Sequence, residues 1–230
     1  MKNIMIRQPG YFPNIGFFKK IQSSHMFVFL NDVQFSKDSF DNRNQIKSKN
    51  NSEWITVPLK RPVFEKKLNE VSISYSTDWV SEHTNKILEN YRFAPYFFSY
   101  WYEIEKILNK KFEFLIDLNL ELIHYFLKIL DITTPIINSS ELSITKTKTE
   151  RLIEICSQLE ATCYISGIGG KDYLDELLFE EHKIELIYEN FIHPKYNQLN
   201  GNFLKNMSII DLLFNEGHNS KKIINESQNL

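Results

Sequence analysis

Short apolar runs alternate with helical patterns at both ends of this 230-residue chain. Residues 4–6 form an apolar run, residues 15–21 a helical pattern, and residues 26–30 a second apolar run of strand length. Near the other end, the runs 163–165 and 184–188 enclose another helical pattern. Such alternation is typical of βαβ units, because parallel strands need a crossover between them. We therefore predict an α/β fold, with a parallel or mixed sheet flanked by helices.

The middle third of the chain predicts a helical subdomain inserted into this fold. Apolar residues recur at helical spacing over residues 78–91, 96–108 and 112–130. An amphipathic helix buries such a stripe against another element. We therefore expect residues 78–130 to form a helical layer beside the sheet.

Two polar stretches interrupt the pattern. Residues 35–46 are rich in polar side chains, and the alternating run 54–57 that follows them predicts a β-hairpin excursion. After Gly217 the chain becomes rich in Asn and Lys. We therefore assign residues 1–217 to a single domain and residues 218–230 to a polar C-terminal tail that frays.

Charge and cysteine content exclude several classes of protein. Lys and Arg number 27 against 29 Asp and Glu, so no overall basic field is available to hold nucleic acid. No apolar stretch approaches the roughly 20 residues that cross a bilayer, and no secretory signal is recognised. The two cysteines form no CxxC pair, and no histidine has metal-site spacing. We predict a cytoplasmic protein with no membrane span, no general nucleic-acid binding and no metal.

A constrained loop follows the first apolar run. Residues 8–16 contain two prolines, which fix the backbone, and Gly16, which lets another group approach closely. Ligands in such sheets sit beyond the carboxyl ends of strands. Gln8 and Tyr11 are therefore candidate substrate-binding residues. The alternative is a rigid turn whose aromatic side chains pack in the core.

Cations and amides follow the second apolar run. Arg43 offers a planar fork for phosphate and Lys47 a point charge, and Gln34 and Asn44 in the same stretch are further candidate substrate-binding residues. Asp32, at the strand end, is a candidate general base or a ligand for a ribose or sugar hydroxyl. The alternatives are a solvated charged loop and a turn-forming aspartate.

A glycine turn separates the last two strand candidates. Residues 166–171 follow a strand and precede a helical pattern over 172–179, a context in which backbone amides can cradle phosphate. The spacing fits neither the P-loop nor the G-x-G-x-x-G fingerprint, so a tight βα connection is the alternative. The candidate binding residues of this segment are Tyr164, Ser166, Gly167, Gly170 and Tyr173.

Three further side chains are candidates. His83 lies in a helical pattern and is a second candidate base, although a lone helical histidine is more often structural. Tyr196 and Gln198 lie in a polar loop near the end of the chain and are candidate substrate ligands.

Strings of residues spread over positions 2–217 resemble the WbqC-like protein family. In the first half the matching residues are Gln8, Pro9, Tyr11, Pro13, Gly16, Asp32, Val33, Gln34, Phe35, Arg43, Asn44, Trp54, Thr56, Pro58, Trp79, His83 and Tyr91. In the second half they are Ser139, Ser140, Glu141, Leu142, Tyr164, Ile165, Ser166, Gly167, Gly170, Tyr173, Leu174, Phe191, Tyr196, Gln198, Phe203 and the run 208–214. One departure is His25, where the family pattern has an acidic residue.

The resemblance implies a cytoplasmic enzyme of bacterial surface polysaccharide synthesis, such as that of the O-antigen of lipopolysaccharide. The implied substrate is a nucleotide-activated amino-deoxy sugar, and the implied reaction is acyl or aminoacyl transfer to its amine, with glycine among the candidate groups. The implied co-substrate is an activated donor: aminoacyl-tRNA, acyl-CoA or an ATP-derived species. No catalytic residue is carried over from the family. Two alternatives remain: an ATP-dependent nucleotidyl-transfer or adenylate-forming enzyme, and a non-catalytic binding module of the same pathway.

Overall fold

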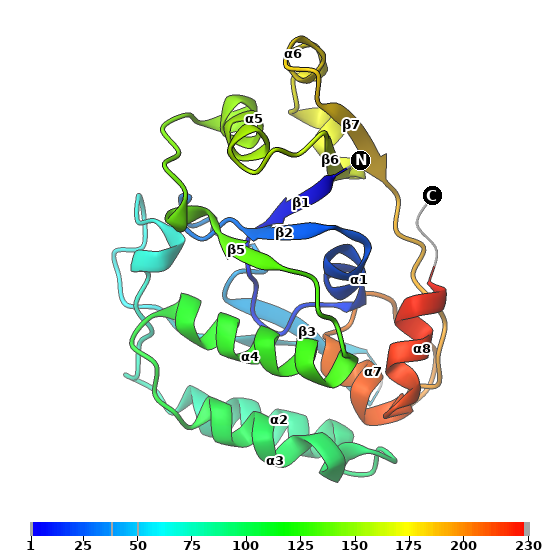
Figure 1. The fold of residues 1–230 in the computed structure, drawn as a ribbon. Coiled ribbons are helices and arrows are strands. Elements are labelled where there is room, and N and C mark those ends of the chain that lie inside the picture. Colours follow the sequence, from blue (N-terminus) through cyan, green and yellow to red (C-terminus); the bar gives the residue numbers. More distant parts are fainter. Residues whose placement is uncertain (1, 38, 50, 228–230) are drawn as a thin grey trace.

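The computed structural model describes residues 2–37, 39–49 and 51–227, and its centre is a five-stranded parallel sheet (Figure 1). The strands are β1 (Asn3–Arg7), β2 (Met26–Phe29), β5 (Ile136–Asn138), β6 (Cys163–Gly167) and β7 (Glu185–Glu189), in the spatial order β5-β2-β1-β6-β7. A separate antiparallel pair is formed by β3 (Arg43–Lys47) and β4 (Ser52–Thr56). The predicted α/β class and the hairpin are confirmed, and every pairing within the main sheet is parallel.

The strand order reverses beside β1. From β1 the chain builds outward through β2 to β5 on one side, and it then returns to add β6 and β7 on the other. The β1–β2 register runs from Ile4 opposite Met26 to Arg7 opposite Phe29. In contrast, β1 pairs with β6 only through Asn3 and Ile4. The carboxyl halves of β1 and β6 therefore separate, and this is the point where doubly wound sheets open a crevice.

Alternate residues of the strands face two hydrophobic clusters. Met5 and Phe27 belong to one cluster, together with α1 (Ile15–Ser23), whereas Ile4 and Val28 belong to the other, with α5 (Lys148–Gln158). Because successive side chains of a strand point to opposite faces, α1 and α5 cover opposite faces of the sheet.

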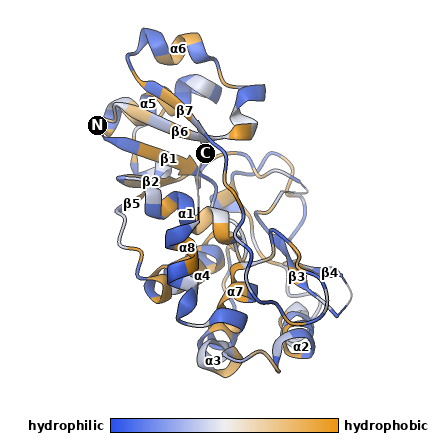
Figure 2. Cartoon of the chain, turned by 90° about the vertical axis from the view of Figure 1, so that its right-hand side faces the viewer, coloured by the Kyte–Doolittle hydropathy of each residue, from blue (hydrophilic) through white to orange (hydrophobic). Residues whose placement is uncertain are grey.

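The predicted helical layer is present and shares the core of the sheet. Its helices are α2 (Trp79–Tyr91), α3 (Phe97–Leu108) and α4 (Leu115–Leu130), close to the predicted ranges. Their buried residues join the cluster that contains α1 and α7 (Ile209–Glu216). Figure 2 shows hydrophobic and hydrophilic residues on the same helices, as expected for amphipathic elements. None of the helices in the described ranges has the length and apolar content needed to cross a bilayer.

Two segments differ from the sequence prediction. Residues 172–179 do not form one helix: a 3-10 helix, η3 (Ile168–Asp172), continues the glycine turn, and α6 (Glu176–Glu181) begins later because Asp175 caps it by accepting from the Leu178 amide. Residues after Gly217 do not fray at once but form α8 (Asn219–Glu226), whose Ile224 is buried in the core. Other short 3-10 helices are η1 (Leu68–Glu70) and η2 (Ser139–Glu141).

Candidate functional site

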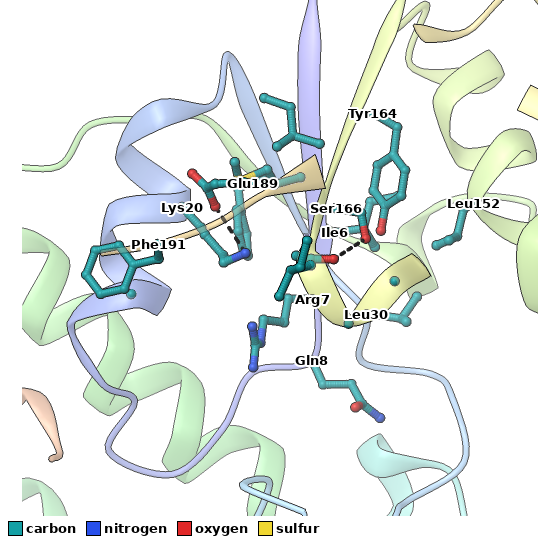
Figure 3. A pocket seen from close by; sticks show the side chains of 18 of the residues that line it. Ile6, Arg7, Gln8, Lys20, Leu30, Leu152, Tyr164, Ser166, Glu189 and Phe191 are labelled. Carbon is teal, nitrogen blue, oxygen red and sulfur yellow. Dashed lines mark hydrogen bonds and ion pairs between the residues drawn. The ribbon is translucent and has the colours of Figure 1, made fainter. Parts of the chain in front are cut away.

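A crevice of about 1040 Å³ lies at the carboxyl ends of β1 and β6 (Figure 3). Its walls come from the end of β1, from α1, from the start of α5, from the glycine turn after β6 and from the segment after β7. The polar side chains among the described lining residues are Arg7, Gln8, Asn14, Lys20, Lys148, Arg151, Tyr164, Ser166, Tyr173, Glu189, Asn190 and Asn206. Four of these side chains are basic and one is acidic, so the crevice favours an anionic ligand.

Arg7 ends the central strand and projects into the crevice. It is exposed, and no hydrogen bond or ion pair joins its side chain to another of the described residues. The protein crowded around it reduces its hydration and lowers the pKa of the guanidinium, while Tyr173 and Asp41 act in the opposite direction. An arginine stays charged in proteins. Arg7 is therefore a fork of donors available to a bound anion.

Lys20 on α1 is already paired. Its Nζ lies 3.1 Å from Oε2 of Glu189 at the end of β7, and both side chains are largely buried. Burial lowers the pKa of Lys20, and the Glu189 carboxylate opposes this. A Cβ on Gly167 would lie 3.1 Å from the same ammonium, so Gly167 leaves room for the lysine against β6.

The glycines of the turn after β6 have different environments. A Cβ on Gly170 would collide with Ser166 Oγ and would lie 2.9 Å from Leu174 Cδ1, so both side chains would have to shift and packing alone favours glycine there. A Cβ on Gly169 would meet nothing within 4 Å. The packing of a tight βα connection therefore explains Gly170 but leaves Gly169, which lines the crevice, without a steric reason.

The first loop takes its shape from two buried asparagines. Asn44 donates to the carbonyl oxygens of Tyr11 (3.3 Å) and Phe12 (2.7 Å). Asn119 on α4 donates to the Pro9 carbonyl at 3.0 Å. Phe12 has a positive φ of 44° and is fully buried. Distant segments thus hold the loop in a conformation that its own residues would not favour.

The Asp32 carboxylate is bound by Arg151 and Ser139 and is not available to a substrate. Its Oδ1 accepts from Nη2 of Arg151 at 2.5 Å and from the Ser139 hydroxyl. Burial raises the pKa of Asp32, but these hydrogen bonds outweigh it, and the pKa lies below its ordinary value. A carboxylate stabilised in its ionised form is a weak base. Arg151, not Asp32, lines the crevice.

His83 is buried away from the crevice. It is 1% exposed, and its Nδ1 lies 3.0 Å from the Tyr11 hydroxyl. Burial lowers the pKa of His83 to about 4. Neither His83 nor Tyr11 is among the lining residues, and this environment is that of a structural histidine.

The hairpin cations also lie elsewhere. The Arg43 guanidinium sits 4.5 Å from the centre of the Trp54 ring. Lys47 is 3% exposed, and its Nζ donates to Gln198 Oε1 (3.2 Å) and to the carbonyl of Asn202 (2.7 Å). Neither cation lines the crevice.

Gln198 and Tyr196 belong to a buried network around Asp211. Both donate to Oδ1 of Asp211 at 2.8 Å, and Tyr91 donates to Oδ2 at 2.8 Å. Burial raises the pKa of Asp211, against the hydrogen bonds it accepts. The network joins the segment after β7 to α7 and to the helical layer.

The structure therefore gathers some of the predicted residues and separates others. Those that line the crevice are Gln8, Tyr164, Ser166, Gly167, Gly170 and Tyr173. Those that do not are Tyr11, Asp32, Gln34, Arg43, Asn44, His83, Lys47, Tyr196 and Gln198. The sequence prediction missed Arg7, Lys20, Lys148, Arg151 and Glu189, while Gly169 lies within the predicted turn. Arg7 and Glu189 carry one recognisable signal, a charged residue that directly follows an apolar strand.

In the ranges that the structure describes, no three His, Cys, Asp or Glu side chains are grouped so as to hold a metal ion.

A model of the WbqC-like protein family matches residues 8–223. A protein of Mycobacterium tuberculosis described as uncharacterized is 35% identical over 220 residues, which cover 94% of this chain and 95% of that protein. A comparison with solved structures gives no match.

Proposed function

Because the chain belongs to the WbqC-like protein family, we propose that it is a transferase that binds a nucleotide-activated amino-deoxy sugar in the crevice. The reaction is acyl or aminoacyl transfer to the sugar amine, with glycine among the candidate groups, in bacterial surface polysaccharide synthesis. Both cysteines are free and buried, which is compatible with the reducing cytoplasm that we propose as its location.

One observation carries the proposal: the guanidinium of Arg7 stands at the reversal of strand order, inside a crevice whose basic side chains outnumber its acidic ones. In open α/β sheets this is where nucleotides bind. Arginine presents paired donors that match phosphate oxygens, and the turn from Gly167 to Gly170 can add backbone amides. Tyr173, which is exposed, offers a ring surface on the crevice wall, whereas the buried ring of Tyr164 stacks on Phe179.

Glu189 is the proposed proton acceptor. In the reaction the sugar nitrogen forms a bond to the acyl carbon, the donor's leaving group departs with its electron pair, and the nitrogen gives up a proton. Glu189 is the carboxylate among the described lining residues, whereas neither Asp32 nor His83 lines the crevice. Lys20 would fix the position of that carboxylate.

The test is calorimetry with a panel of nucleotide-sugars, with and without an amino group on the sugar. We expect an amino-deoxy member to bind, and mass spectrometry to detect the acylated sugar when acyl-CoA, aminoacyl-tRNA or an amino acid with ATP is added. In the transfer assay Glu189→Gln should retain binding and lose most of the product. If no nucleotide-sugar binds, the protein is better described as a docking module.

The same crevice supports a second candidate. A nucleotide bound at the reversal of strand order could also be the substrate of adenylate formation or nucleotidyl transfer. Release of pyrophosphate from ATP without an acyl donor would favour that reaction over direct acyl transfer.

A further inference from the structure

The basic side chains of the crevice form two sets on opposite faces of the sheet. Arg7 follows Met5 by two residues and so leaves β1 on the face covered by α1, which also supplies Lys20. Lys148 and Arg151 lie in the first turn of α5, which covers the other face. The crevice runs between the two sets across the carboxyl edge of the sheet.

The second set is built around a fixed guanidinium. Asp32 holds one terminal nitrogen of Arg151 at 2.5 Å, and the Ser139 hydroxyl donates to the same carboxylate oxygen. The Arg151 side chain is only 13% exposed, and its Nε has no hydrogen-bond partner among the described residues. A guanidinium has five N–H donors, so this clamp orients the group and leaves donors for another acceptor.

Lys148 adds to the second set a positive charge that is not used in an ion pair with another described residue. It is exposed on the crevice wall, and no ion pair within the described ranges involves it. Its φ of 52° is unusual for a residue with a side chain, so the start of α5 is held in a conformation of raised energy.

We propose that Arg151 and Lys148 form a second oxyanion subsite, separate from the one at Arg7, that takes a phosphate of the acyl donor. Asp32 and Ser139 are positioning residues of this subsite. The inference rests on the proposed function for the identity of the ligand: each donor considered above, aminoacyl-tRNA, acyl-CoA or an acyl adenylate, carries phosphate. Two separate subsites would let donor and sugar lie side by side over the sheet edge.

The test uses inorganic pyrophosphate, which needs no assumption about the sugar. Calorimetry on the full chain should give two sites. Arg151→Gln should weaken one of them at least tenfold and leave the other within twofold, and Arg7→Gln should do the reverse. Lys148→Gln should weaken the same site as Arg151→Gln by a smaller factor. The second subsite would be refuted if calorimetry showed a single pyrophosphate site whose affinity both arginine variants reduce. It would also be refuted if the protein bound no pyrophosphate.

The role of Asp32 has its own readout. Asp32→Asn removes the charge of the clamp at nearly constant size, and it should weaken the Arg151 site while the Arg7 site is unchanged. A merely structural role would lower the unfolding temperature and weaken both sites equally, which would refute the assignment. Arg151→Lys keeps the charge but loses the fork and should not restore the affinity. If the protein binds no nucleotide-sugar, the proposed function is wrong. The pyrophosphate measurement would still decide whether the second subsite exists.

Discussion

The hydroxyl oxygen of Tyr11 lies 3.0 Å from Nδ1 of His83, in the interior between the first loop and α2. Both side chains are buried, and the Trp79 ring packs against the histidine with its centre 5.2 Å from that of the imidazole. A charged imidazole there would lose most of its hydration. The pair therefore stabilises the fold with the histidine neutral, and this has a measurable pH dependence.

Folding stability should fall on mild acidification because of His83. Its pKa is about 4 in the folded protein and about 6.5 when unfolded, so the unfolded state binds the proton first. The stabilisation is complete above pH 6.5 and lost progressively down to pH 4. Between pH 7 and pH 5 we expect the free energy of unfolding, measured by urea denaturation, to fall by about 2 kcal/mol.

His83→Gln should remove this part of the pH dependence. His182→Gln is the matched control, because His182 is exposed on the surface. Equal slopes of stability against pH for wild type and His83→Gln would contradict the buried neutral histidine.

The two glycines of the crevice turn should respond in opposite ways to alanine. Gly169→Ala should leave stability unchanged or raise it slightly, since its Cβ meets nothing, but it should weaken nucleotide-sugar binding if ligand approaches the turn. Gly170→Ala should lower the melting temperature because of the contacts with Ser166 and Leu174. Undiminished binding by Gly169→Ala would show that the ligand does not touch this part of the turn.

Arg7→Gln should weaken nucleotide-sugar binding by about 1.5 to 3 kcal/mol, the range for a hydrogen bond to a charged group. Arg43→Gln is the control, since Arg43 stacks on Trp54 outside the crevice. Isothermal titration of both variants decides between the two arginines. If Arg43→Gln lost more affinity for the nucleotide-sugar than Arg7→Gln, the phosphate site would lie at the hairpin, as the sequence alone predicted.

Helix α8 should contribute to global stability. Ile224 is 1% exposed, so Ile224→Ala should cost about 2 to 5 kcal/mol of unfolding free energy. Lys222→Ala on the same helix should change it by less than about 0.5 kcal/mol, because Lys222 is exposed. Similar denaturation midpoints for the two variants would mean that α8 is only loosely attached.

The sequence predicted the elements of the fold better than it predicted the site. Strand and helix periodicities are local, so the βαβ ends and the three helices of the middle layer could be predicted from neighbouring residues. The missed helix α8 has a narrow apolar face, Ile223 and Ile224, within a polar sequence. Residues at the site depend on which strand ends meet, and only the sheet order determines that.

The cations illustrate the difference. Arg43 and Lys47 look like a phosphate clamp in the sequence, but Trp54 and Gln198 engage them. The position of Arg7 directly after a strand is a signal in the sequence, but it does not single out a binding residue, because an arginine after a strand is common. Its importance comes from β6, more than 150 residues away, which separates from β1 beside it.

The central strand of the sheet, β1, precedes the other four strands along the chain. β1 can pair with β2 after a short helix, but its other neighbour begins at Cys163. Domains generally fold as units during synthesis, from the N-terminal side first. A nascent or truncated chain that stops before β6 can thus build half of the sheet, but the edge of β1 that β6 would cover stays unpaired and one wall of the crevice is missing. Such a product should be prone to aggregation.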